Sequence, residues 1–338
     1  MVIGGSAGAI AALRELLAAL PAPFPAAIVV VVHISPDSPA LLGKTLARRV
    51  RLPIVSAQDG MKVEPDRVIV GMPDLHLTIV GDSVRLTHGP RENRHRPSID
   101  VLFRSAAVAC GPRVIGVVLT GMLDDGAAGL WAVKRRGGIA MVQDPAQAEY
   151  PEMPRNAIEA TDVDVQGSIS ELARHLSTLA GSPVIRPTGA VPPDMDYEVG
   201  MAIENKSDMD QLDRVGRRTP FTCPECGGAM WELDDARTPR FRCHVGHAYS
   251  IHSFASEQST RVEATLWAAL RSLEENEHLA RRLAERAGSH GNQRSERYHI
   301  ESAMESAAHA DVLRSMLAGL RPTAGTSGTE EAKATSRK

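Results

Sequence analysis

The sequence predicts an α/β fold in which a doubly wound, mostly parallel sheet is covered by helices on both faces. Three observations support this class. Over the first 180 residues, short β-branched runs alternate with amphipathic stretches at helical spacing. Several runs are apolar throughout, which is typical of central parallel strands. The composition, 43% hydrophobic and 23% charged, is that of a globular protein.

The predicted elements follow one another as β-α units. Residues 1–3 form the stub of a strand, and a helix over residues 7–20 follows it, because Leu13, Leu16 and Leu17 recur at helical spacing. Further parallel strands are expected at 27–32, 114–119 and 139–142, with helices at 98–110, 126–136, 154–160 and 170–179. Between them, residues 67–70, 76–80 and 83–87 are separated by Met-Pro and Gly-Asp, and we expect an inserted antiparallel hairpin region.

Beyond this first domain, residues 1–180, the pattern changes three times. Residues 181–220 are rich in Pro, Gly and Asp, which predicts a linker, and residues 221–254 hold a Cys/His cluster. Residues 255–320 are helical with a break at 288–291, which predicts a helical hairpin that buries its own apolar stripe. A docking surface for partner helices is the alternative interpretation of that stripe. Residues 321–338 are expected to be disordered.

Charge and hydropathy exclude two classes of partner. Thirty-eight Lys and Arg against forty-one Asp and Glu leave a net charge of -3, and no basic block predicts nucleic-acid binding. The longest apolar run, residues 26–32, is much shorter than the roughly 20 residues that cross a bilayer, and no charged segment precedes it. We therefore expect a cytoplasmic protein that is not inserted in a membrane.

The loop after the first strand carries a candidate nucleophile. Residues 4–8 have the G-x-S-x-G form, in which a sharp strand-to-helix turn exposes the hydroxyl of Ser6. The amino end of the following helix would stabilise an oxyanion, but it would suit a phosphate equally well. The loop by itself therefore leaves a phosphate-binding loop or a simple tight turn as alternatives.

Two further residue types favour a catalytic triad. His33 ends the second predicted strand, and Asp124 and Asp125 follow the strand at 114–119. Since carboxyl ends of parallel strands share one edge of the sheet, Ser6, His33 and an aspartate should meet there, as in acyl-transfer enzymes. The alternatives are a hydrogen-bonded strand-end histidine and an aspartate that caps the helix at Gly126. Among the competing histidines, His76, His88 and His95 lie in the inserted region, so they rank below His33.

Several motifs occur in an order that resembles the CheB family of chemotaxis protein-glutamate methylesterases. They are residues 4–8, Val32-His33, residues 93–103 (NRHRPSIDVLF), residues 119–129 (LTGMLDDGAAG) and Met153-Pro154-Arg155. The resemblance covers about residues 1–180.

The resemblance implies a reaction and its residues. It places the catalytic serine at Ser6, the histidine at His33 and the aspartate at Asp125. It implies hydrolysis of glutamate γ-methyl esters on the cytoplasmic helices of chemoreceptors, which releases methanol, with deamidation of receptor glutamines as a second activity and other signalling proteins as further partners. The chemistry needs no metal or organic cofactor. Arg94, Arg96 and Arg155 remain without an assigned role.

The chain departs from the family pattern at its start. Such enzymes commonly carry an N-terminal receiver domain, and here the nucleophile loop begins at Gly4, which leaves no room for one. We therefore expect activity without a phosphodonor, and the clipped first strand predicts a true start further upstream. Ala9 also replaces a glycine that is usual in the family, a change that a helix tolerates.

The cysteine spacing near the C-terminus predicts a structural zinc site. Cys223 and Cys226, then Cys243 and His247, have the spacing of a zinc-ribbon-like module, too short to form a core without a staple. We rank His247 above the adjacent His244 and treat His252 as a distant third; reduced cysteines without a metal are the alternative. We also expect that chelation unfolds this module while the esterase domain keeps its activity.

The leading hypothesis is therefore a serine esterase that acts on receptor methyl esters. A non-catalytic module that binds phosphate or a nucleotide at residues 4–8 is the alternative from another class. A serine esterase with a small-molecule substrate is the third hypothesis, since a triad does not specify the acyl group.

Overall fold

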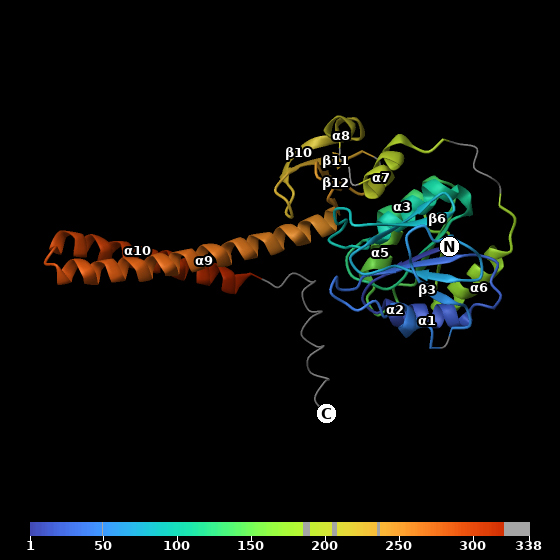
Figure 1. The fold of residues 1–338 in the computed structure, drawn as a ribbon, viewed down its shortest axis with the longest axis horizontal. Coiled ribbons are helices and arrows are strands. Elements are labelled where there is room, and N and C mark those ends of the chain that lie inside the picture. Colours follow the sequence, from blue (N-terminus) through green and yellow to red (C-terminus); the bar gives the residue numbers. More distant parts are fainter. Residues whose placement is uncertain (49, 185–189, 205–207, 235–236, 321–338) are drawn as a thin grey trace, which may run out of the picture. The chain divides into compact units, whose positions relative to one another are not determined.

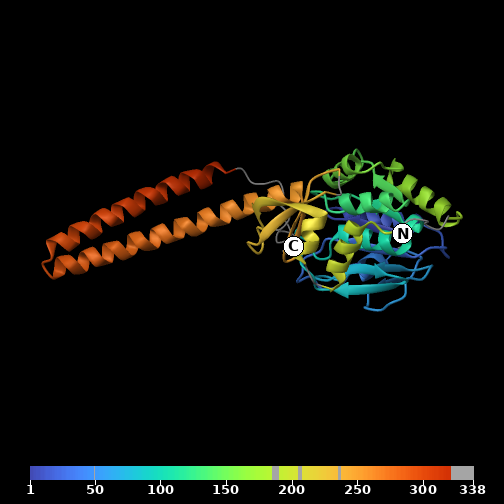
Figure 2. The same cartoon turned by 90° about the horizontal axis from the view of Figure 1, so that it is seen from above.

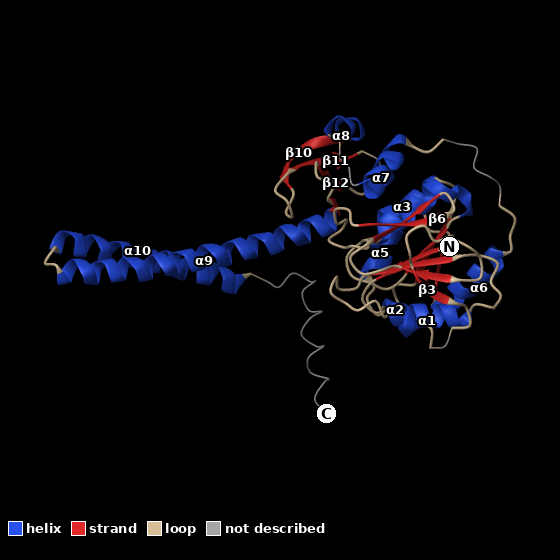
Figure 3. Ribbon diagram, viewed as in Figure 1, coloured by secondary structure: helices blue, strands red, loops and turns tan. Residues whose placement is uncertain are grey.

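Seven parallel strands form the central sheet of the computed structural model, which describes residues 1–48, 50–184, 190–204, 208–234 and 237–320 (Figures 1 and 3). The strand order is β3-β4-β2-β1-β7-β8-β9. Their bounds are β1 (Val2–Gly5), β2 (Ile28–Val32), β3 (Ile54–Ser56), β4 (Val68–Val70), β7 (Ile115–Val118), β8 (Ile139–Gln143) and β9 (Val165–Gly167). The predicted α/β class with a parallel sheet is confirmed.

Helices cover both faces of this sheet. In β2, Val29 and Val31 join one core, whereas Val30 and Val32 join the other, because successive strand residues point to opposite faces. The first core is closed by α3 (Ile99–Cys110), α4 (Ala127–Arg135) and α5 (Glu152–Ala160), and the second by α1 (Ala9–Ala19), α2 (Leu42–Leu46) and α6 (Ile169–Ala180). Figure 1 shows α1 and α2 below the sheet and α3 above it.

The inserted hairpin is smaller than predicted. Strands β5 (His76–Val80) and β6 (Ser83–Thr87) form the expected antiparallel pair. The prediction for residues 67–70 was wrong, because β4 pairs in parallel with both β2 and β3 inside the main sheet. All three residues of β4 are buried, which fits a central strand better than an inserted one.

The segment predicted as a linker contains two helices. Helix α7 (Pro193–Glu204) packs against α3 and buries Met195 and Met201, and α8 (Met209–Val215) follows it. The prediction that the whole of residues 181–220 is a linker was therefore wrong. Its Pro and Asp residues begin helices: Pro193 is the first residue of α7, and the side chain of Asp208 accepts a hydrogen bond from the backbone of Asp210 at the start of α8.

Four antiparallel strands form the Cys/His module, which we call the ribbon (residues 216–250). They are β10 (Gly216–Thr222), β11 (Ala229–Leu233), β12 (Arg240–Cys243) and β13 (Ala248–Ser250), paired in that order. The ribbon belongs to the same compact unit as the central sheet, Met1–Phe254, while Ala255–Lys338 form a second unit. It starts five residues before the predicted boundary at 221.

The second unit is a helical hairpin, formed by α9 (Ile251–Ser289), whose first turn lies in the first unit, and α10 (Gln293–Gly319), which run side by side (Figure 2). The chain reverses at Gly291, close to the predicted break. The expectation that the hairpin buries its own apolar stripe was wrong. Small side chains fill most of the contact, so large apolar residues of the stripe are exposed: Val262, Leu279, Met304, Val312 and Met316. Residues 321–338, predicted to be disordered, lie outside the described residues.

Among the residues that the structure describes, no helix combines the length and the apolar character needed to cross a bilayer.

Candidate active site

Ser6 lies immediately after β1, at the carboxyl edge of the sheet. The chain turns into α1 at Gly8, whose φ of 74° is a left-handed conformation that favours glycine. A Cβ on Gly5 would lie 2.6 Å from the Cβ of Ala9, so the strand and helix could not approach as closely with a larger residue. The Ser6 amide donates to the Thr120 carbonyl at 3.0 Å, which holds the loop against the end of β7.

The sheet brings the three predicted triad residues together. Strands β1 and β2 are neighbours, with Gly5 opposite Val32, so Ser6 and His33 leave the sheet side by side. His33 Nδ1 lies 3.1 Å from Ser6 Oγ, and His33 Nε2 lies 2.7 Å from Asp125 Oδ2. The side chains of His33 and Asp125 are 6% and 2% exposed. This continuous chain of hydrogen bonds is the geometry that the sequence predicts.

Asp125 is held as a carboxylate by the amino end of α3. Its oxygens accept hydrogen bonds from the amides of Ile99 and Asp100 at 2.7 and 3.2 Å and from Ser98 Oγ at 2.8 Å. Burial opposes ionisation, but the hydrogen bonds with His33 and from Asn93 hold the pKa of Asp125 well below its usual range. The aspartate therefore stays negative beside the histidine at neutral pH.

This arrangement decides the tautomer of His33. A carboxylate only accepts hydrogen bonds, so the Nε2 that faces Asp125 carries the proton. Nδ1 then presents a lone pair to the Ser6 hydroxyl. His33 can accept the serine proton without any rearrangement of the ring.

Two residues next to the triad were missed as site residues from the sequence. Asn93 Nδ2 donates to Asp125 Oδ1 at 2.9 Å. The ring of His95 stacks on that of His33, with centroids 3.5 Å apart and planes 12° apart, and burial together with the nearby His33 lowers the pKa of His95 well below the usual value. Both residues belong to the motif at 93–103, which contributed to the family resemblance but indicated no role for either of them.

Two of the competing histidines and one unassigned arginine have partners away from the triad. His76 Nε2 lies 2.9 Å from the Pro90 carbonyl, and His88 lies 2.9 Å from Asp74. Arg96 donates to both the side chain and the carbonyl of Asp74, which ties residues near the hairpin together. Arg155 is exposed.

Asp124 provides a test of pH-dependent stability. Its carboxylate accepts a hydrogen bond from Ser250, and burial raises its pKa from 3.8 to about 6. The folded protein thus keeps a proton that the unfolded chain releases, so the contribution of Asp124 to the free energy of unfolding falls as the pH rises from about 4 to about 6. We expect Asp124→Asn to remove this contribution and so change the slope of the free energy of unfolding against pH, measured by urea unfolding across that range. An unchanged slope would contradict the assignment.

The four predicted metal ligands converge at one end of the ribbon. One ligand atom from each of Cys223, Cys226, Cys243 and His247 lies within 4.8 Å of the others. The Cys226 and Cys243 sulfurs are 3.7 Å apart, and His247 Nδ1 lies 3.8 and 3.6 Å from the Cys223 and Cys243 sulfurs. A tetrahedron with bonds of about 2.3 Å to sulfur has edges of about 3.8 Å, so the donor set fits zinc.

The two lower-ranked histidines occupy other surroundings. The ring of His244 lies against Gly228, where a Cβ would be only 2.2 Å from the imidazole. His252 is exposed, in the first turn of α9. The packing thus supports the ranking that puts His247 first.

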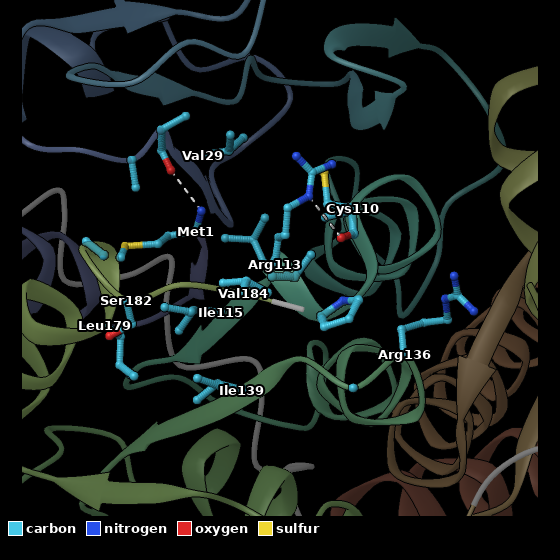
Figure 4. A pocket seen from close by; sticks show the side chains of 18 of the residues that line it. Met1, Val29, Cys110, Arg113, Ile115, Arg136, Ile139, Leu179, Ser182 and Val184 are labelled. Atoms are coloured by element: carbon cyan, nitrogen blue, oxygen red, sulfur yellow. Dashed lines mark hydrogen bonds between the residues drawn. The ribbon is translucent and has the colours of Figure 1, made fainter. Parts of the chain in front are cut away.

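A large hollow, whose lining residues are drawn in Figure 4, lies at the amino-terminal edge of the sheet. Its volume is about 930 Å³, and Met1, Val114 and Ile139 line it at the amino ends of β1, β7 and β8. Ser6 and His33 follow the carboxyl ends of β1 and β2. The hollow is therefore separate from the candidate active site despite its size.

Comparisons with known proteins match the first half of the chain. The model of the CheB methylesterase family matches residues 1–176. A putative protein-glutamate methylesterase/protein-glutamine glutaminase of Leptospira interrogans is 42% identical over 174 residues, which cover 51% of this chain and 90% of that protein. The crystal structure of the Thermotoga maritima CheB methylesterase catalytic domain is 32% identical with a TM-score of 0.51, covering 53% of this chain and 96% of that domain.

A longer relative shows how far the similarity extends. Protein-glutamate methylesterase/protein-glutamine glutaminase 4 of Anaeromyxobacter dehalogenans is 39% identical over 189 residues. The match covers 54% of this chain and 52% of that protein, so this chain spans about half of that relative. The family match ends before the ribbon begins.

Proposed function

Because this chain belongs to the CheB methylesterase family, we propose that it hydrolyses glutamate γ-methyl esters of chemoreceptors with Ser6 as the nucleophile. The observation that carries the proposal is the unbroken chain of hydrogen bonds from Ser6 through His33 to Asp125. A loop that merely binds phosphate does not require this chain of partners, so the geometry favours the enzyme over the binding module.

The first half of the reaction forms an acyl-enzyme. Ser6 Oγ attacks the γ-carbonyl carbon while His33 Nδ1 takes the hydroxyl proton. The carbonyl oxygen becomes an oxyanion close to the amino end of α1, whose dipole favours negative charge. When the C–O bond to the methoxy group breaks, His33 returns the proton and methanol leaves.

The second half regenerates the enzyme. Water attacks the acyl carbon, His33 takes one of its protons, and the bond from the acyl carbon to Ser6 Oγ breaks as Ser6 recovers that proton. The net change is one ester and one water converted to a carboxylic acid and methanol, and the acid ionises at neutral pH. Asp125 remains a carboxylate throughout and stabilises the protonated ring of His33. The chemistry requires no cofactor.

The proposal extends to a second activity and to the partner. The relatives are named protein-glutamine glutaminases as well, and the same acyl-enzyme forms from a glutamine side chain when ammonia replaces methanol as the leaving group. The substrates are the cytoplasmic helices of methyl-accepting chemoreceptors, which places the enzyme in the cytoplasm. Other signalling proteins are further candidate partners.

Methanol release tests this proposal directly. Receptor helices carrying isotopically labelled methyl esters are incubated with the full chain, and volatile label is counted. The proposal predicts that labelled methanol is released until all receptor esters have been hydrolysed. Release of p-nitrophenol from p-nitrophenyl acetate, with the receptor esters left intact, would instead support a small-molecule esterase.

For the ribbon, we infer that Cys223, Cys226, Cys243 and His247 hold one structural zinc ion. Three thiolates and an imidazole at tetrahedral spacing support this inference. Four protein ligands leave no open position on the ion, so its role is to stabilise the ribbon, whose own apolar core is small.

Metal analysis with matched histidine variants checks this inference. We expect one zinc per chain in the wild type, loss of the ion in Cys226→Ser and His247→Ala because each removes a ligand, and retention in His244→Ala. Elemental analysis after gel filtration measures the stoichiometry. Zinc loss in His244→Ala with retention in His247→Ala would overturn the choice of the fourth ligand.

A further inference from the structure

We propose that Asn93 is a positioning residue for Asp125 and that Ser250 of the ribbon, together with Ser253 in the first turn of α9, holds Asn93 in place. The inference rests on the proposed esterase function, in which Asp125 orients His33. It gives the C-terminal extension an indirect part in the reaction, through the position of Asp125, although the family match ends before the extension begins.

The side chain of Asn93 connects the triad with the ribbon. Its Nδ2 donates to Asp125 Oδ1 at 2.9 Å and to Asp100 Oδ2 at 2.7 Å. Its Oδ1 accepts from the Ser250 amide at 2.8 Å and from Ser253 Oγ at 3.1 Å. Two donors and two acceptor positions are thus in use on a residue that is 5% exposed. If the side-chain amide of Asn93 were flipped, its NH₂ group would face the backbone N–H of Ser250, which is also a donor. The contacts therefore permit only one orientation of this amide.

The backbone around Asn93 is also hydrogen-bonded to β13, the last strand of the ribbon. The Asn93 amide donates to the Ala248 carbonyl at 2.8 Å, and the Ala248 amide donates to the Arg91 carbonyl at 3.3 Å. Residue 92 therefore forms a parallel bridge with β13. Asn93 has a φ of 51°, a left-handed conformation that asparagine adopts more readily than most residues.

Buried ion pairs fasten the ribbon to the same segment. Arg242 of β12 donates to Glu92 at 2.8 Å and to Glu198 of α7 at 2.7 Å, and Arg104 of α3 donates to Glu92 at 2.7 Å. The side chain of Arg242 is 1% exposed. Arg242 directly precedes Cys243, so one of the proposed metal ligands is adjacent to the cluster that seats Glu92 and Asn93.

These contacts argue against the sequence-based expectation that the ribbon unfolds without loss of activity. When the ribbon is disordered, Asn93 loses its partners Ser250 and Ala248, and Ser253 loses its own bonds to Ser250. Asp125 then keeps its bonds from Ser98 and the start of α3, but Asn93, one of the three donors to its Oδ1, is no longer fixed. We expect chelation of the ribbon to lower kcat by about ten- to a hundredfold, because small displacements of catalytic groups are costly.

A double-mutant cycle tests whether Ser253 affects the reaction through Asn93. The single variants are Ser253→Ala and Asn93→Ala, and kcat and KM are measured for methylated receptor in the full chain. Ser259→Ala is the matched control, because this exposed serine on α9 bonds the carbonyl of Ala255 in its own helix. If Asn93→Ala does not fold, Asn93→Ser, whose side chain is too short to reach Asp125, takes its place.

The proposal predicts a lowered kcat with little change in KM for Ser253→Ala, and no further effect of Ser253→Ala once Asn93 is replaced. Equal losses in both backgrounds, or an unchanged kcat in Ser253→Ala, would overturn it. The two proposals fail differently. A wild-type chain that releases no methanol contradicts the esterase function, whereas an active wild type with an equally active Ser253→Ala variant contradicts only the role of the ribbon.

Discussion

Ser6→Ala is expected to abolish methanol release from methylated receptors while the protein stays folded. The side chain forms the new covalent bond, and loss of a nucleophile of this type costs on the order of 10⁵- to 10⁶-fold in kcat. Release of labelled methanol measures the effect. The fold should survive because the loop is held by the Ser6 amide and by Gly8, which the substitution leaves in place.

The control for this variant is Ser259→Ala, which makes the same chemical change on an exposed helix. Far-ultraviolet circular dichroism and the melting temperature confirm that both variants are folded. Turnover in Ser6→Ala within about a hundredfold of the wild type would remove Ser6 from the mechanism, since a triad serine contributes far more than that.

Asp125→Asn is expected to produce the second largest loss, about 10⁴-fold in kcat. If the asparagine oxygen faces His33, it accepts the hydrogen bond from Nε2 less strongly than a carboxylate does. If the NH₂ group faces His33 instead, it favours the tautomer with the proton on Nδ1, which cannot accept the proton of Ser6. The amide also meets a ring of donors from Asn93, Ser98 and the start of α3, which suit a carboxylate. The measurement is kcat for receptor esters.

Asp124→Asn is the matched comparison. The carboxylate of Asp124 accepts a hydrogen bond from Ser250, and the side-chain oxygen of the asparagine can accept the same bond. We expect its kcat to stay within about tenfold of the wild type. A larger loss in Asp124→Asn than in Asp125→Asn would show that the wrong acid has been assigned to His33.

Much of the fold could be predicted because its central strands are long and apolar. The runs that contain β2, β7 and β8 are buried on both faces, and their β-branched residues carry a clear signal. Strands β3 and β9 have three residues each, too few for a periodicity, and β4 was assigned to the hairpin because a Met-Pro turn follows it. Helix α7 was missed because its start is rich in proline and aspartate.

The candidate site could be predicted as far as strand topology determines it. Ser6 and His33 end adjacent strands, and Asp125 follows a third, so one sheet edge collects them. Asn93 and His95 lie on an irregular loop in which residues 93 and 94 both have positive φ. The contact between Asn93 and Ser253 joins residues 160 positions apart, and local sequence pattern carries no information on such a pairing.

Covalent labelling by a serine-directed fluorophosphonate, mapped by peptide mass spectrometry, tests the esterase mechanism most directly. The proposed triad predicts one adduct per chain on the peptide that contains Ser6, and no adduct in His33→Ala, because the serine then lacks its base. An unlabelled Ser6 in a chain whose residues 4–8 are protected from proteolysis by inorganic phosphate would contradict the mechanism and support the phosphate-binding alternative.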